Sequence, residues 1–101
     1  MKVRWSPTAV SDLVAIREYI AEDSPAAARK VAQKIKDAIQ TLRRFPLSGK
    51  TGREPETREL VIPGTSYIAV YSIQSDEVII ATILHGRQNW PKPSSRIISP
   101  S

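Results

Sequence analysis

The chain has 101 residues, of which 41% are hydrophobic and 25% charged, a composition typical of one globular domain and unlike that of a disordered or membrane-embedded chain. Fifteen Lys and Arg against ten Asp and Glu give a formal net charge of +5, which favours an anionic partner such as nucleic acid, a nucleoprotein machine or an acidic protein. The absence of Cys excludes disulfides, thiolate metal sites and a Cys nucleophile.

The N-terminal segment carries charge but no apolar run of signal-peptide length, and no stretch is long and apolar enough to cross a bilayer. We therefore expect a cytoplasmic protein without membrane association.

The first half of the chain predicts a strand followed by two helices. After a short strand at Lys2–Trp5, Ser6-Pro7 has the pattern of a helix N-cap with proline at the first helical position. Asp23-Ser24-Pro25 repeats this signal, and the second helix is expected to stop at Phe45-Pro46. Apolar residues recur at helical spacing in both segments, at Ala9, Leu13, Ile16 and Ile20 in the first and at Ala28, Val31, Ile35, Ala38, Ile39 and Leu42 in the second. Two amphipathic helices with a short link predict an antiparallel hairpin whose apolar faces need a sheet.

The second half predicts strands. Residues 47–57 lack periodicity and are expected to form a loop, whereas 58–62, 67–73 and 78–84 have the composition of strands, with a tight hairpin at Ser75-Asp76. The last strand is nearly continuously apolar, as in a central strand buried on both faces. The predicted fold is α+β, in β-α-α-β-β-β order: an N-terminal strand, the helical hairpin and a three-stranded antiparallel sheet.

We expect residues 1–91 to form a single domain and residues 92–101, rich in Pro and Ser, to form an extended tail. The chain has no phosphate-binding Gly loop, zinc-ligand spacing or nucleophile elbow, so neither a metal nor a cofactor is expected.

Basic residues gather instead at the ends of predicted elements. If Arg58, His85 and Arg87 converge, they form a cationic site that can hold a phosphate and, through the His85 imidazole, move a proton near neutral pH. In the alternative, Arg58 and Arg87 pair with Glu59 or Glu56 on the surface and His85 only caps the sheet.

Several stretches, in this order and spacing, resemble the RelE/ParE toxins over about Val3 to Pro91. They are Arg4-Trp5-Ser6-Pro7, Tyr19-Ile20-Ala21, Ser24-Pro25-Ala26-Ala27-Ala28, Phe45-Pro46, Arg58-Glu59-Leu60, Tyr67-Ile68-Ala69-Val70-Tyr71 and Ile83-Leu84-His85-Gly86-Arg87-Gln88. The family's fold has the predicted β-α-α-β-β-β order. The resemblance implies the toxin of a type II toxin–antitoxin pair, with an acidic or amphipathic antitoxin segment that folds on binding.

The family contains two activities. RelE-like members cleave mRNA in the ribosomal A site, for which Arg58, His85 and Arg87 are the candidate catalytic residues here. ParE-like members inhibit DNA gyrase, and the Ser-Pro opening, the Ser-Pro-Ala-Ala-Ala helix start and the Leu-His-Gly-Arg-Gln ending resemble this branch more closely. We therefore expect gyrase inhibition first, and name the residues expected to contact the target. They are Lys50, Arg53, Arg87, Trp90 and Arg96. A non-toxic nucleic-acid-binding or adaptor domain is the third alternative.

Overall fold

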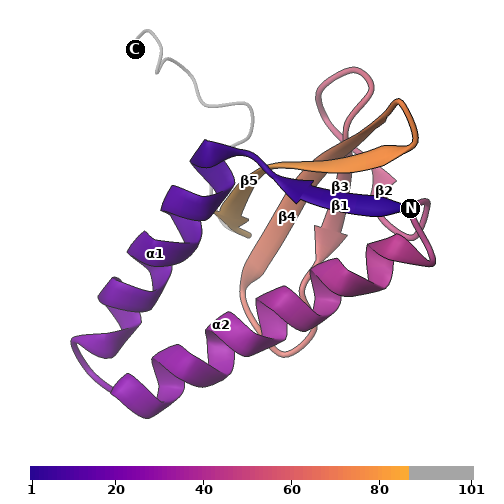
Figure 1. The fold of residues 1–101 in the computed structure, drawn as a ribbon. Helices are drawn as coiled ribbons and strands as arrows, with labels where there is room; N and C mark the ends of the chain where they lie inside the picture. Colours follow the sequence, from indigo (N-terminus) through magenta and orange to yellow (C-terminus); the bar gives the residue numbers. More distant parts are fainter. Residues whose placement is uncertain (87–101) are drawn as a thin grey trace, which may run out of the picture.

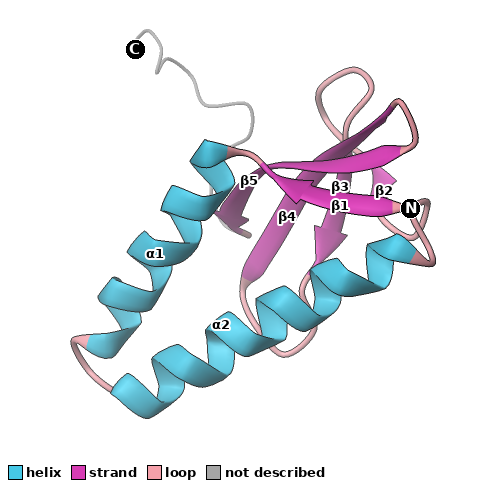
Figure 2. Cartoon of the chain, in the orientation of Figure 1, coloured by secondary structure: helices cyan, strands magenta, loops and turns pink. Residues whose placement is uncertain are grey.

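The computed structural model describes residues 1–86. Its elements follow one another as β1 (Lys2–Trp5), α1 (Pro7–Ala21), α2 (Pro25–Gln40), the 3-10 turn η1 (Thr41–Arg43), β2 (Lys50–Thr51), β3 (Arg58–Val61), β4 (Tyr67–Gln74) and β5 (Glu77–His85) (Figure 1). The predicted α+β fold is confirmed, because one strand is followed by a pair of helices and then by a run of antiparallel strands (Figure 2). Three predicted contact residues, Arg87, Trp90 and Arg96, and the predicted tail at 92–101 lie outside the described residues.

Both helices begin where the cap-and-proline pattern places them. The Ser6 hydroxyl accepts a hydrogen bond from the Ala9 amide at 3.0 Å, and the Ser24 hydroxyl accepts one from the Ala27 amide at 3.1 Å. The second helix ends earlier than predicted: α2 stops at Gln40, and one 3-10 turn continues the chain before Phe45-Pro46.

The strands form one five-stranded sheet in the order β1-β5-β4-β3-β2. Strand β1 pairs in parallel with β5, and the remaining neighbours are antiparallel. The expectation of an unstructured loop at 47–57 was wrong in one respect, because Lys50–Thr51 pairs with β3 as the edge strand β2. The predicted hairpin at Ser75-Asp76 is confirmed, and both residues adopt positive φ, as a two-residue connection between twisted strands requires.

The core lies between the helices and one face of the sheet. Ile35 and Ile39 of α2 pack with Tyr71 of β4 and with Ile80 of β5, and all four are at most 1% exposed. Strand β5 lies inside the sheet as predicted, but its first half alternates between buried and partly exposed residues, so burial on both faces was an overstatement. Within residues 1–86 no helix has the length and apolar character needed to cross a bilayer.

Candidate partner-binding site

The structure places the predicted basic residues along different parts of the sheet. Lys50 lies in the edge strand β2, opposite Glu59 of β3, and is exposed. Arg53 follows in the 52–57 turn, where its backbone amide and its Nε both donate to the Glu59 carboxylate, at 3.1 and 3.3 Å. Glu59 is only 3% exposed, so this pair secures the turn against the sheet.

These contacts set the ionisation of Glu59. Burial alone would raise the pKa of the Glu59 carboxyl, but the two hydrogen bonds from Arg53 and the positive charges of Arg53 and Lys50 outweigh it and hold this pKa below its ordinary value. A depressed folded-state pKa contributes stability that is present above the unfolded-state pKa, about 4.3, and is lost as the pH falls through the lower folded value.

We therefore expect Glu59→Gln to lower the free energy of unfolding at pH 7 by about 1–2 kcal/mol, because it weakens two charge-assisted hydrogen bonds. The difference from the wild type should shrink as the pH falls below about 4.3, because the carboxylate is protonated first in the unfolded chain and then, below its lowered pKa, in the folded protein. Urea unfolding from pH 3 to pH 7 measures this, with the exposed Glu18→Gln as a control. A difference that is independent of pH would contradict the electrostatic explanation.

Arg58 has a structural partner set of its own. Its Nη1 donates to the carbonyl oxygens of Gly49 at 2.7 Å and Leu47 at 3.3 Å, so the guanidinium holds the chain segment that precedes β2. The alternative in which Arg58 pairs with Glu59 or Glu56 is therefore wrong for the described residues, because Glu59 pairs with Arg53 and Arg58 binds backbone carbonyls.

His85 lies across β4 from Arg58, because β5 and β3 flank that strand on its two sides. Its ring packs edge-on against Tyr67, with centroids 5.4 Å apart, and His85 is the register partner of Tyr67, whereas Arg58 is the partner of Tyr71. Tyr67 and Tyr71 are four residues apart along β4, and β3 and β5 are two strand spacings apart. Together these separations put the backbones of Arg58 and His85 roughly 16 Å apart. The sheet thus does not bring these two candidates together, and Arg87 lies outside the described residues.

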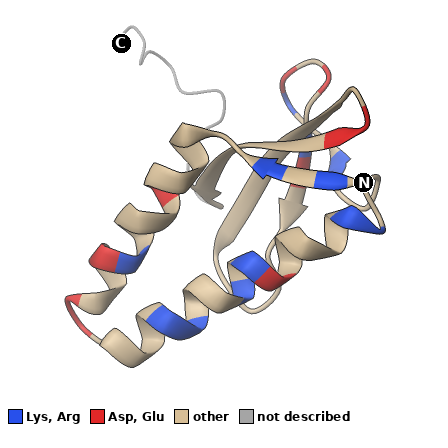
Figure 3. Ribbon diagram, viewed as in Figure 1, with Lys and Arg blue, Asp and Glu red and all other residues tan. Residues whose placement is uncertain are grey.

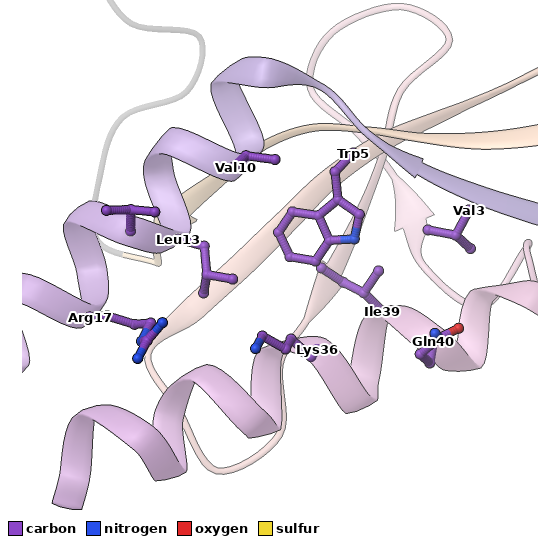
Figure 4. A pocket seen from close by; sticks show the side chains of 9 residues that line it. Val3, Trp5, Val10, Leu13, Arg17, Lys36, Ile39 and Gln40 are labelled. Atoms are coloured by element: carbon purple, nitrogen blue, oxygen red, sulfur yellow. The ribbon is translucent and has the colours of Figure 1, made fainter. Parts of the chain in front are cut away.

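An apolar groove lies between α1, α2 and β1 (Figure 4). Its volume is about 330 Å³. Trp5 forms its centre, with its ring lying between the two helices, while Arg17 and Lys36 stand at its rim from opposite helices. The remaining lining residues are Val3, Val10, Leu13, Val14, Ile39 and Gln40.

Helix α1 explains why this groove is open. The predicted stripe through Ala9 and Leu13 packs toward the core, but Val10 and Val14 face away from it and are 49% and 48% exposed. Apolar residues on two sides of a surface helix indicate a second contact face that residues 1–86 leave uncovered. The predicted core stripe did not include Val10 and Val14, although their i, i+4 spacing outside that stripe was the available signal.

The rim of the groove is basic. Neither Arg17 nor Lys36 forms an ion pair with another residue in the 1–86 range, and α2 adds Arg29, Lys30 and Lys34 along the same helix (Figure 3). An apolar floor beneath unpaired cations fits an amphipathic segment that carries acidic residues.

Comparison with known proteins identifies the family. The model of the ParE toxins of parDE type II toxin–antitoxin systems matches residues 3–90. The chain belongs to this ParE toxin family. Among its relatives, the protein Y4kP of Sinorhizobium fredii is 41% identical over 91 residues, which cover 90% of this chain and 94% of Y4kP. Toxin RelE2 of Caulobacter vibrioides is 33% identical over 84 residues, covering 83% of this chain and 93% of RelE2.

A solved structure agrees with this assignment. The ParE-family chain superposes on a chain of the chromosomal ParDE toxin–antitoxin system of P. aeruginosa with a TM-score of 0.78, at 25% identity, over 84% of this chain and 95% of that one. The protein is thus the toxin of a type II toxin–antitoxin system, as the resemblance implied. Among residues 1–86 of this ParE-family toxin, no group of three or more Asp, Glu, His or Cys could hold a metal ion.

Proposed function

We propose that this toxin inhibits DNA gyrase by binding to it, without catalysis of its own. One observation carries the preference for this mechanism over RNA cleavage: Arg58 and His85 pair with β4 residues four positions apart, on opposite sides of that strand, and the Arg58 guanidinium is occupied by two backbone carbonyls. General acid–base cleavage of RNA needs its proton-transfer and phosphate-binding groups within hydrogen-bond reach of one phosphate. The likeness to a ParDE chain supports the same choice.

The decisive experiment adds the purified toxin to DNA gyrase and relaxed plasmid. Inhibition of supercoiling, or accumulation of cleaved plasmid, at toxin concentrations near that of the enzyme is the expected result. In cells, induction of the toxin without antitoxin should cause filamentation and a DNA-damage response while mRNA stays intact. Full supercoiling at a large molar excess of toxin would overturn the proposal.

RelE-like cleavage of mRNA on the ribosome is the second candidate, and the relative named RelE2 is the observation that favours it. It predicts rapid, translation-dependent mRNA cutting after induction, which His85→Ala should abolish while the fold is retained. Growth arrest that survives His85→Ala would exclude a nuclease that depends on this residue. No arrest by the wild-type toxin would favour the non-toxic adaptor alternative.

We further propose that the antitoxin neutralises the toxin by laying an amphipathic, acidic segment into the groove between α1, α2 and β1. The relative from P. aeruginosa belongs to a two-component toxin–antitoxin system, which supports a partner of this kind. Trp5, Val10 and Val14 offer the apolar contact. Arg17 and Lys36, which have no ion pair within residues 1–86, offer opposite charge to the segment's carboxylates.

A further inference from the structure

A second surface lies away from the groove, on the loop that joins η1 to β2. This loop, residues 45–49, follows the C-terminal end of α2, at the far end of that helix from the α1–α2 link (Figure 1). Phe45 and Leu47 are 61% and 66% exposed, more than any other large apolar residue among the described ones except Tyr19. Neither residue lines the groove.

The loop that carries these side chains is fixed in place by the sheet. The Tyr71 hydroxyl donates to the Pro46 carbonyl at 2.7 Å and accepts from the Gly49 amide at 2.9 Å, while Arg58 donates to the carbonyls of Leu47 and Gly49. Tyr71 is fully buried, so its hydroxyl is an anchor within the core. A Cβ at Gly49 would lie 2.7 Å from the Tyr71 ring, which shows how closely the loop backbone approaches this anchor.

A rigid loop that displays apolar side chains has the properties of a binding hot spot. Exposure of Phe45 and Leu47 does not help solubility. The backbone of their loop, at Pro46, Leu47 and Gly49, makes four hydrogen bonds with the side chains of Tyr71 and Arg58. Preorganised apolar anchors lose little conformational entropy on association, which is why such residues contribute strongly to affinity.

The positive charges beside the loop indicate an acidic partner. The Arg44 guanidinium carbon lies 5.9 Å from the centre of the Phe45 ring, and the exposed Lys50 begins the strand that follows the loop. Neither cation has an ion pair with another residue in the described range. A second copy of this chain placed symmetrically on the loop would bring like charges together, so self-association is disfavoured.

We propose that the 45–49 loop is the surface with which the toxin engages its target, and that the target presents an apolar pocket for Phe45 and Leu47 rimmed by carboxylates for Arg44 and Lys50. This inference rests on the proposed function in one respect, namely that the toxin acts by binding a protein. It does not depend on which protein that is.

The test compares three variants of the full-length toxin. Phe45→Ser/Leu47→Ser removes the apolar anchors, Arg44→Gln/Lys50→Gln removes the two charges, and Val61→Ser alters an apolar residue on β3 that is 55% exposed. Growth arrest is titrated with inducer, gyrase binding is measured with the purified proteins, and thermal melting together with binding of the co-encoded antitoxin reports on the fold.

We expect the double Ser variant to keep its melting temperature and its antitoxin affinity but to lose toxicity, with gyrase affinity reduced about thirtyfold or more. The Gln variant should weaken binding by a smaller factor and make it less sensitive to salt, and Val61→Ser should behave as the wild type.

Several results would overturn the inference. One is growth arrest by the double Ser variant at wild-type inducer levels. Another is a double Ser variant that loses antitoxin binding but keeps its toxicity, because the loop would then belong to the antitoxin interface. Arrest that is abolished by the Gln variant and spared by the Ser variant would indicate nucleic acid as the partner. If the wild type arrests growth without binding gyrase, the proposed function fails, while loss of arrest in the Ser variant still supports the loop as the target-binding surface.

Discussion

Val14→Asp is expected to leave the toxin active but insensitive to its antitoxin. Val14 is half-exposed on α1 and lines the groove, so the substitution changes little in the free protein beyond helix propensity, about 0.5 kcal/mol. In the proposed complex, the new carboxylate would be desolvated against an apolar surface and close to the acidic groups of the bound segment. We expect the affinity for the antitoxin to fall about a hundredfold, which corresponds to roughly 2.7 kcal/mol.

The measurements are calorimetric titration with the co-encoded antitoxin and growth in cells that express both proteins. Ser11→Asp is the matched control, because it adds the same charge to an exposed position of the same helix outside the groove lining. Cells with Val14→Asp should stop growing even when antitoxin is supplied, and cells with Ser11→Asp should be rescued. Rescue of both variants would show that the antitoxin is held elsewhere.

Asp12→Ala is expected to destabilise the protein more than any other single change to an exposed or half-buried polar residue of α1. One carboxylate oxygen of Asp12 accepts hydrogen bonds from the Thr82 hydroxyl and, at 3.0 Å, from the Ile83 amide. Strand β1 covers the edge of β5 only from Glu77 to Ile80, so Asp12 satisfies the donors beyond that point. Loss of the carboxylate leaves two donors without their acceptor and should lower the free energy of unfolding by about 2–4 kcal/mol.

Thermal and urea unfolding measure this effect, and a domain of this size should melt roughly 10–20 °C lower. Asp23→Ala, in the exposed link between the helices, should shift stability by less than about 0.5 kcal/mol. In a Thr82→Val background, Asp12→Ala should have a smaller effect, because one of the two donors is already gone. Equal effects in the two backgrounds would mean that the contact with Thr82 contributes nothing.

The candidate site was only partly predictable. The sequence identified Lys50, Arg53, Arg58 and His85 as basic residues at element ends, but their convergence depends on strand register, which composition does not specify. Arg58 was predicted to bind a phosphate or a surface carboxylate, and the structure gives it two backbone carbonyls instead. The groove was missed because its walls come from β1, α1 and α2, and only their packing leaves Val10 and Val14 uncovered.

Local physics in the sequence determined much of the fold. Ser6-Pro7 and Ser24-Pro25 set the helix starts through hydroxyl caps and the fixed φ of proline, and Ser75-Asp76 set the β4–β5 hairpin. Each of these features depends on residues only a few positions apart, so the local sequence is enough to predict it.

Only the tertiary structure decided the features that join distant segments. The parallel pairing of β1 with β5, the Asp12 contact with Thr82 and the Tyr71 anchor beneath the 45–49 loop link residues 22 to 75 positions apart. These contacts form only when the helices and the sheet pack around one common core, so no local sequence pattern predicts them.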